Sequence, residues 1–277
     1  MPEGHTIVRW ARLLHPLVGV PLEHVDLPFR LSPEARSLVG LRIAGIRTHG
    51  KHLLFELSDG RVLHTHALMF GSWELVRRGS AFRKAAATIR LRLATRTHDA
   101  AFFSGPIVEL LTPDELSIHP RLTALGPDLL RDVFDIDEAR TRLTRPDVQA
   151  APIGTVLLDQ TVVAGIGNIF KSEALFQAAV HPNTPTRHIA RATMDDLLGI
   201  ARSQMLVAAR GSGPIQTVPR TRGERPGAPR HFVYRRAGEP CLICRTRIRR
   251  IRQGQGARST YFCPRCQAGS AGRLRLF

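Results

Sequence analysis

Four cysteines lie within 26 residues of one another, as two pairs that read CLIC and CPRC. Cys241 and Cys244 form the first pair, Cys263 and Cys266 form the second, and 18 residues separate the pairs. This spacing is typical of a zinc site in which four thiolates fill the tetrahedral positions of the metal. Because no position stays open for water, we expect one zinc ion with a structural role. Two disulfides are the alternative, which an intracellular setting disfavours.

The chain begins MPEGH, which places a proline and a glutamate directly before an apolar helical pattern. Pro2 and Glu3 are ordinary residues at a helix start, because proline gives up no needed N–H there and a carboxylate favours the positive end of the helix. On these residues alone, helix initiation is the preferred interpretation. A chemical role for them needs support from elsewhere in the chain.

A glycine-containing stretch predicts two consecutive helices, one over 152–161 and one from residue 168 or 169 to 179. Gly165 and Gly167 permit a tight turn between them. Asn168 then stands at the start of the second helix, where its side chain can cap the helix and exposed backbone N–H groups can hold a phosphate. A simple capping role is the alternative.

The net charge of +17 is concentrated at one end of the chain. Residues 210–277 contain 16 arginines, no lysine and two acids, a net charge of +14. The remaining three quarters are nearly balanced, so general solubility does not explain the bias. A polyanion is the expected partner, with nucleic acid ahead of a ribosomal or membrane surface.

The composition of the 277 residues, 43% hydrophobic and 23% charged, is ordinary for a globular protein with more than one core. No run reaches the roughly 18 apolar residues of a membrane span, and the start lacks the segments of a secretory signal. We expect an intracellular protein without a membrane partner, located in the cytoplasm and associated with the nucleoid.

The elements that must position these residues differ along the chain. A first amphipathic helix, with Ile7, Ala11, Leu14 and Val18 on one face, precedes short alternating stretches that predict an antiparallel β-sandwich. These stretches read LRIAGIRTHG, HLLFELSDG, RVLHTHALMFGSWELV, TIRLRLAT and AAFFSG. Between the cysteine pairs, two short strands and a turn are expected, held by zinc because so small a piece cannot bury enough apolar surface to fold alone.

We therefore predict an α+β multidomain protein with three parts. They are an N-terminal helix and antiparallel β-sandwich over 1–125, a helical domain over 131–235, and a four-cysteine zinc-finger β-hairpin over 236–277. Residues 211–230, rich in Gly, Pro and Arg, predict a mobile loop within the helical domain.

Several segments, in the same order, resemble the formamidopyrimidine-DNA glycosylase and endonuclease VIII (Fpg/Nei) family of base-excision repair enzymes. They read MPEG, GKHLLFELSDG, HALMFGSW, ELLTPDELSIHPRLTALGPDLL, LLDQTVVAGIGNIFKSEALF, VYRRAGEPCLICRTRI and GARSTYFCPRCQ. The resemblance implies that the predicted helix pair is a helix-two-turn-helix. It also implies a bifunctional DNA glycosylase and AP lyase, acting as a monomer on double-stranded DNA that contains oxidised bases or abasic sites.

The resemblance gives the amino terminus a chemical role. After loss of the initiator methionine, Pro2 matches the proline whose amine attacks C1′ of the damaged nucleotide and forms a Schiff base. Glu3 matches the general acid and base, which must hold a proton for part of the cycle. Lys51 matches a lysine assigned to proton transfer, and Arg258 matches a finger arginine that contacts phosphates and is linked to δ-elimination after β-elimination.

The resemblance also assigns DNA contacts. Asn168 matches a phosphate-binding asparagine that acts with Arg258, and Leu68, Met69 and Phe70 match the loop that fills the gap left by an extruded nucleotide. For these three residues a place in a core strand is the alternative.

The chain departs from the family pattern at several places. His5 and Thr6 replace a common Pro-Glu, and Leu68 stands where endonuclease VIII relatives often have a glutamine. The PRRFG segment of Fpg has no counterpart near AFFSGPIVELL, and this absence favours the endonuclease VIII branch, with oxidised pyrimidines as the expected substrates. A non-catalytic zinc-finger protein that binds damaged or abasic DNA is the main alternative. A zinc-ribbon protein that binds other nucleic acid or the ribosome is another.

Overall fold

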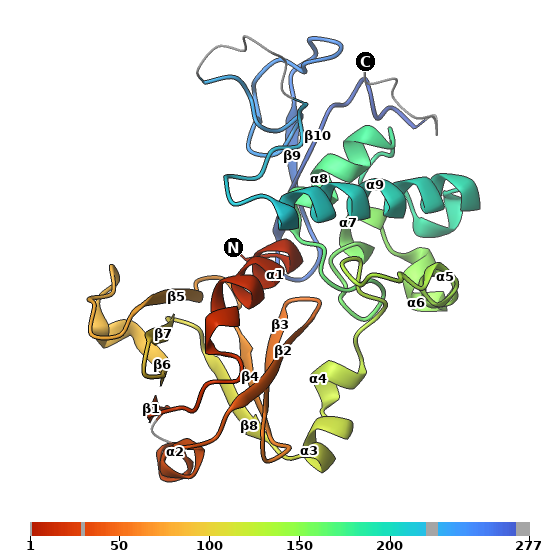
Figure 1. The fold of residues 1–277 in the computed structure, drawn as a ribbon. Coiled ribbons are helices and arrows are strands. Elements are labelled where there is room, and N and C mark those ends of the chain that lie inside the picture. Colours follow the sequence, from red (N-terminus) through yellow and green to blue (C-terminus); the bar gives the residue numbers. More distant parts are fainter. Residues whose placement is uncertain (1, 29–30, 220–226, 270–277) are drawn as a thin grey trace. The chain divides into compact units, whose positions relative to one another are not determined.

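A computed structural model describes residues 2–28, 31–219 and 227–269 (Figure 1). The chain divides into two compact units, Met1–Ala124 and Leu125–Phe277, here called the N-terminal and C-terminal units. Each is described by itself. Residues 220–226 of the predicted mobile loop lie outside the described residues.

The N-terminal unit begins with helix α1 (Gly4–Leu14), whose buried side includes Ile7 and Leu14. A 3-10 turn (His15–Leu17) with a proline at its start follows directly, so Val18 lies beyond the helix and not on its predicted apolar face. Val18 instead bridges to Ile43 at the start of a strand, which fixes the end of the helix beside that strand.

Two four-stranded antiparallel sheets form the predicted β-sandwich of this unit. One has the order β1-β6-β7-β5 and the other the order β2-β3-β4-β8. The strands are β1 (His24–Asp26), β2 (Ile43–His49), β3 (His52–Leu57), β4 (Val62–His66), β5 (Ser72–Arg77), β6 (Ile89–Ala94), β7 (His98–Phe103) and β8 (Ile107–Leu111). Side chains from both sheets share one core, in which Trp73 lies between Phe55 and Phe102 with ring centroids 5.3 and 5.1 Å away.

Three short helices complete the unit: α2 (Ser32–Leu38), α3 (Pro113–Ser117) and α4 (Pro120–Thr123). Helix α3 starts with a capping box, because the Thr112 hydroxyl accepts the N–H of Glu115 and the Glu115 carboxylate accepts the N–H of Thr112. Helix α4 starts in a less common way, with the His119 ring accepting the N–H of Leu122 at 3.3 Å.

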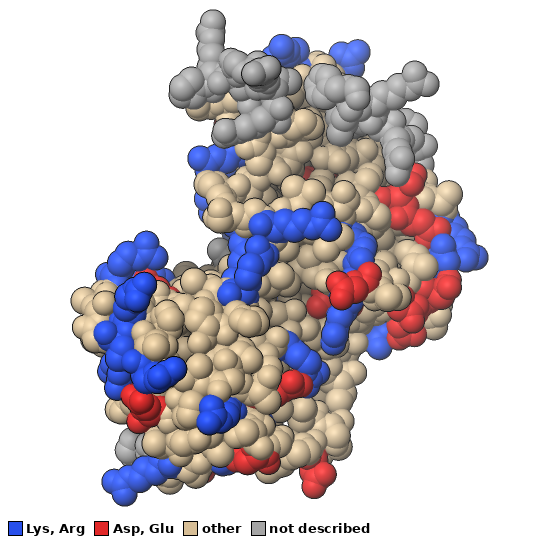
Figure 2. Space-filling view, in the orientation of Figure 1, with Lys and Arg blue, Asp and Glu red and all other residues tan. Residues whose placement is uncertain are grey.

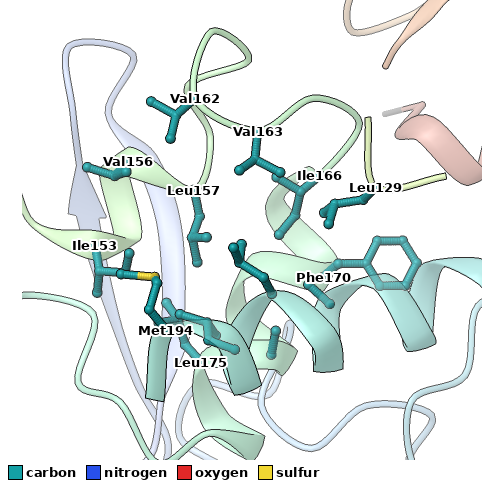
Figure 3. Packing of buried hydrophobic residues seen from close by; sticks show 14 of the residues in the cluster. Leu129, Ile153, Val156, Leu157, Val162, Val163, Ile166, Phe170, Leu175 and Met194 are labelled. Carbon is teal, nitrogen blue, oxygen red and sulfur yellow. The ribbon is translucent and has the colours of Figure 1, made fainter. Parts of the chain in front are cut away.

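The C-terminal unit is helical up to the finger, as predicted. Its helices are α5 (Ile136–Leu143), α6 (Pro146–Ala150), α7 (Ile153–Val156), α8 (Asn168–Gln177) and α9 (Arg191–Arg210). Figure 3 shows part of their shared core, in which Leu157, Ile166, Phe170 and Leu175 belong to one cluster of almost fully buried side chains.

The first helix of the predicted pair is shorter than expected. Helix α7 covers one turn and ends at Val156, whereas the apolar pattern predicted a helix over 152–161. Side chains divert the backbone after this point: Asp159 accepts the N–H of Thr161 at 2.9 Å, and Gln160 accepts the N–H of Gly165 at 3.0 Å. Such local bonds compete with helix formation. Gly165 has a φ of 96°, which favours glycine.

The segment between the two cysteine pairs contains the predicted hairpin, formed by β9 (Arg249–Gln253) and β10 (Arg258–Phe262) in antiparallel register.

Acidic side chains gather elsewhere in the same unit, near α5 and α6 (Figure 2), where Asp137 and Asp195 pair with Arg140. Among the described residues, no helix is long and apolar enough to cross a membrane.

Candidate active site and zinc centre

Pro2 and Glu3 lie directly before α1, as the sequence predicted. Pro2 is half-buried, and Glu3 is the N-cap residue, with its carbonyl oxygen accepting the N–H of Thr6 at 2.7 Å. The Glu3 side chain makes no capping bond and is only 1% exposed. A simple helix-initiation role would leave this carboxylate in water or on the helix N–H groups, so its burial next to Pro2 needs another reason.

His5, one of the two departures from the family pattern, is buried on the first turn of α1. Its Nε2 lies 3.1 Å from the hydroxyl of Thr6, the other departure. Burial, and then the charge of Arg9, lower the pKa of His5 to about 3, so the ring is neutral at physiological pH. His5 therefore adds a neutral polar group, not a charge, next to Glu3.

Lys51 occupies a two-residue hairpin turn between β2 and β3, closed by the pair His49 and His52. Gly50 has a φ of 56° and Lys51 lies outside the positive-φ region, which is the pattern of a type II′ turn with glycine first. Helix α1 packs against both strands. Since the end of α1 lies beside the start of β2, its beginning points toward the end of β2 that carries Lys51 (Figure 1).

Leu68, Met69 and Phe70 lie beyond the end of β4 and outside the core. Their exposed fractions are 48%, 42% and 79%, which rules out the core-strand alternative for these residues. Leu68 has a φ of 46°, an uncommon value for a residue with a side chain. Its N–H donates to Nδ1 of His66 at 3.2 Å, so the histidine holds the start of the exposed loop.

Asn168 and Arg258 come from neighbouring elements of the C-terminal unit. Asn168 is the first residue of α8 and Arg258 the first of β10, and these two elements pack together. Gly167, not Asn168, is the N-cap, and it makes no side-chain cap. Asn168 is 7% exposed, and its Oδ1 accepts no hydrogen bond within the described part of the chain. The capping alternative is therefore wrong.

Two buried charged residues of α8 were not singled out from the sequence. Lys171 and Glu173 are both 0% exposed. The Glu173 carboxylate accepts the N–H groups of Phe232, Val233 and Tyr234 at 2.8 to 2.9 Å, and the hydroxyl of Thr217. Helix α8 thereby holds the chain that leads into the finger. The signal in the sequence was a lysine and a glutamate within an otherwise apolar helix, NIFKSEALF.

The four cysteine sulfurs converge as the sequence predicted, all within 4.8 Å of one another. The Sγ atoms of Cys241 and Cys266 are 3.9 Å apart, and those of Cys244 and Cys263 are 3.4 Å apart. Zn–S bonds of about 2.3 Å in a tetrahedron place neighbouring sulfurs about 3.8 Å apart, so the arrangement fits one zinc ion. Gln267 supports the site, because its Oε1 accepts the N–H of Cys263 and its Nε2 donates to Val180, each at 2.8 Å.

The predicted residues thus fall into two groups. The N-terminal unit contains Pro2, Glu3, Lys51 and the exposed loop, and the C-terminal unit contains Asn168, Arg258 and the four cysteines. A histidine cluster on the outer face of the β2-β3-β4-β8 sheet was not predicted, because its members converge only through strand pairing. Its signal in the sequence was the alternation of histidines in VLHTH, which follows GKHLL after seven residues.

Three families match successive parts of the chain. Residues 1–106 match the formamidopyrimidine-DNA glycosylase N-terminal domain, residues 125–218 the formamidopyrimidine-DNA glycosylase H2TH (helix-two-turn-helix) domain, and residues 238–269 a zinc finger found in FPG and IleRS. A relative from Streptomyces coelicolor, named probable endonuclease 8 2, is 36% identical over 99% of this chain and 96% of its own length. Endonuclease 8 of Pectobacterium atrosepticum is 33% identical over 97% of this chain and all of its own.

A solved structure has the same fold over nearly the whole chain. It is the Lactococcus lactis FPG mutant G226P in complex with DNA that contains Fapy-dG, with a TM-score of 0.79 and 26% identity, covering 96% of this chain and 99% of that one. The predicted fold, with antiparallel sheets, a helix-two-turn-helix and a four-cysteine finger, is confirmed. The chain therefore belongs to the formamidopyrimidine-DNA glycosylase and endonuclease VIII family.

Proposed function

We propose that this chain excises oxidised pyrimidines from double-stranded DNA and then cleaves the strand by β,δ-elimination, with Pro2 as the nucleophile. Its family makes it a DNA glycosylase and AP lyase of base-excision repair. The observation that carries the proposed mechanism is the position of Pro2 directly before α1, beside a glutamate that is 1% exposed.

The amine of Pro2, freed by loss of Met1, suits nucleophilic attack at neutral pH. An α-amino group has an ordinary pKa of about 7.7 to 8.0 against about 10.4 for lysine, so several hundred times more of it is neutral. Its attack at C1′ forms an N–C bond as the glycosidic bond breaks. The sugar ring then opens, because the C1′–O4′ bond breaks and O4′ takes up a proton, and the secondary amine is left as an iminium ion at C1′. Glu3, adjacent and buried, is the candidate that gives a proton to the leaving group.

The remaining residues act on the sugar and the phosphates. The iminium ion acidifies the proton at C2′, and Lys51 is the candidate for proton transfer in the β-elimination that follows. Asn168 and Arg258, on packed elements, are suited to hold phosphates beside the extruded nucleotide. We assign Arg258 an electrostatic role in δ-elimination, because a guanidinium hardly deprotonates. Zinc, held by the four cysteines, supplies the stability of the finger.

The exposed loop is suited to fill the space that an extruded base leaves. Extrusion costs a few kcal/mol, and apolar side chains inserted between base steps offset part of that cost. Leu68, Met69 and Phe70 are already exposed at the tip of this loop. Their exposure supports a role as the wedge, and Phe70 has the largest exposed fraction of the three.

The pyrimidine preference rests on one departure in the sequence and on the relatives. The PRRFG segment of Fpg has no counterpart near AFFSGPIVELL, and the relatives from Streptomyces coelicolor and Pectobacterium atrosepticum carry endonuclease 8 names. We also propose that the chain acts as a monomer on nucleoid DNA. The net charge of +17 supports binding to a polyanion and predicts a steep loss of affinity with salt.

Borohydride trapping tests the proposal. Protein whose amino terminus is confirmed to be proline is incubated with an abasic-site duplex and with a dihydrouracil duplex. We expect a covalent adduct on both from the wild type, with the DNA attached at Pro2 in peptide mapping, and loss on dihydrouracil alone from Glu3→Gln. No adduct from folded, zinc-loaded wild type would refute the lyase mechanism and favour a protein that only binds damaged DNA. Equal trapping on an 8-oxoguanine duplex would refute the pyrimidine preference.

A further inference from the structure

The outer face of the β2-β3-β4-β8 sheet carries a chain of hydrogen-bonded side chains that the proposed chemistry does not use. His52, His64 and Glu109 come from β3, β4 and β8, and His119 is the residue before α4. Nδ1 of His52 lies 2.8 Å from Nε2 of His64, and Nδ1 of His64 lies 2.8 Å from Oε2 of Glu109. Nε2 of His119 lies 3.2 Å from the same carboxylate oxygen. We call these four residues the histidine spine.

Backbone contacts decide which nitrogen carries each proton in the spine. The N–H of Leu122 is shared between the carbonyl oxygen of His119 at 3.0 Å and Nδ1 of His119 at 3.3 Å, so Nδ1 accepts and the proton of this ring is on Nε2, which faces Glu109. Glu109 can only accept, so Nδ1 of His64 must also donate to it. Nε2 of His64 is then an acceptor, which His52 fills with its Nδ1–H. The bonds therefore run in one direction, from His52 to the carboxylate.

This direction argues against a metal ion at the same residues. His64, Glu109 and His119 have the types and spacing of a metal site with two histidines and one carboxylate, with donor atoms within 4.8 Å of one another. A histidine that binds a metal through Nε2 carries its proton on Nδ1, which must then donate. In His119 that nitrogen accepts the N–H of Leu122 instead. The local geometry thus favours a hydrogen-bonded spine over a metal site.

The histidine rings of the spine are buried, whereas the Glu109 side chain is 32% exposed. His64 is 0% and His52 6% exposed, and burial, followed by the charges of neighbouring histidines, lowers the pKa of His52 to about 2. Burial opposes ionisation of Glu109, but its bonds from His64 and His119 outweigh this and lower its pKa. A buried ring bonded through both nitrogens has one favourable orientation. His64 therefore fixes His52 in place.

His52, the end of the spine that His64 holds in place, is the residue after Lys51. His52 pairs with His49 to close the two-residue turn, so little flexible backbone separates the spine from the lysine. The His52 ring also lies 4.4 Å from the ring of His66, whose pKa is lowered by burial and further by His64 and Lys51. The Lys51 ammonium thus lies near neutral imidazoles that would repel it if they were protonated.

We propose that the histidine spine is a positioning network that holds the Lys51 turn in the geometry needed for β-elimination. This inference rests on the proposed function, in which Lys51 transfers the proton. A displacement of about 1 Å at a catalytic group can reduce a rate by about 100-fold, so a device that fixes the turn without touching DNA can matter to the chemistry. His64 and Glu109 are its central residues.

The test separates imine formation by Pro2 from elimination through Lys51. With enzyme in excess over an abasic-site duplex, borohydride-trapped adduct and cleaved strand are measured at short times. We expect His64→Phe and Glu109→Leu to slow elimination by about tenfold or more while trapping changes by less than about twofold, as misplacement of one catalytic group predicts. Glu109→Gln keeps an oxygen that can accept both bonds and should stay within about threefold of wild type. His24→Phe, at an exposed histidine of the other sheet, is the matched control.

A double variant distinguishes positioning from general stability. If the spine acts through Lys51, adding His64→Phe to Lys51→Ala should slow elimination no further, whereas independent effects of the two substitutions on the rate would multiply.

The proposal would be overturned if both His64→Phe and Glu109→Leu eliminate at the wild-type rate. It would also be overturned if the rate effects of His64→Phe and Lys51→Ala multiply. A second metal ion per chain, lost in His64→Phe, would also overturn it. If His64→Phe does not fold, the comparison of Glu109→Gln with Glu109→Leu decides. No adduct from wild type would refute the proposed function itself.

Discussion

Nζ of Lys171 lies 2.7 Å from the hydroxyl oxygen of Thr260, and this bond joins α8 to β10 inside the C-terminal unit. The same ammonium lies 3.5 Å from the carbonyl oxygen of Ser259, the residue after Arg258. Asn168, at the start of α8, is three residues before Lys171. One buried lysine therefore links the two elements that carry the proposed phosphate contacts.

Lys171→Met should weaken DNA binding although the residue is fully buried. The thioether fills similar space but cannot donate to Thr260, so β10 is free to shift against α8 and Arg258 with it. We expect affinity for a duplex with an abasic-site analogue to fall by about tenfold, equivalent to about 1.4 kcal/mol, measured by fluorescence anisotropy at fixed salt. Lys84→Met removes an equal charge from the exposed surface. An equal loss in both variants would attribute the effect to charge alone.

Glu173→Gln should destabilise the finger. One oxygen of the carboxylate accepts the N–H groups of Val233 and Tyr234, and the other accepts the N–H of Phe232 and a hydroxyl. An amide must direct its own N–H groups at one of these donor pairs, which we expect to cost about 2 to 4 kcal/mol. Zinc release during urea unfolding measures this cost. Unchanged zinc release would contradict it, with Glu56→Gln, at a partly exposed glutamate of the other unit, as the control.

The sequence predicted the features that depend on local pattern. Alternating residues indicated the sandwich, and the cysteine spacing indicated the zinc site, because each signal is contained in a short segment. The end of α7 could not be predicted from apolar spacing, since Asp159 and Gln160 divert the backbone with their own side chains. The histidine spine depends on the register of three strands, in which His64 pairs opposite Glu109, 45 residues later.

His5 should make the N-terminal unit sensitive to acid. Its pKa is lowered to about 3 in the folded protein, mainly by burial, against an ordinary value of 6.5. Below about pH 6.5 the unfolded chain takes up a proton that the folded chain does not. The free energy of unfolding should therefore fall with decreasing pH, by about 1.4 kcal/mol per pH unit for this group, until about pH 3.

Urea unfolding of His5→Leu at pH 7, 6, 5 and 4 measures this contribution. The variant should lose stability less steeply toward low pH than the wild type, by an amount that approaches the slope of one proton. His24→Leu, at an exposed histidine of the same unit, should leave the slope unchanged. If the free energy of unfolding falls with decreasing pH at the same slope in His5→Leu and in the wild type, His5 takes up its proton equally in the folded and the unfolded protein.

Phe70→Ala should slow base removal without lowering the stability of the protein. The Phe70 side chain is 79% exposed, so its truncation should change the free energy of unfolding by less than about 0.5 kcal/mol. If it enters the base stack, its loss removes support for the extruded nucleotide, and single-turnover excision of dihydrouracil should slow by about tenfold or more. Elimination at a preformed abasic site, where no base must be displaced, should slow less.

Val133→Ala is the matched control for this variant, because Val133 is an apolar residue with 86% exposure in the other unit. It should change neither excision nor stability. Equal rates of excision for Phe70→Ala and wild type would exclude Phe70 as the wedge. Since Leu68 is held by its bond to His66 and Met69 is less exposed, the same measurement on Leu68→Ala and Met69→Ala then identifies which side chain of the loop replaces the base.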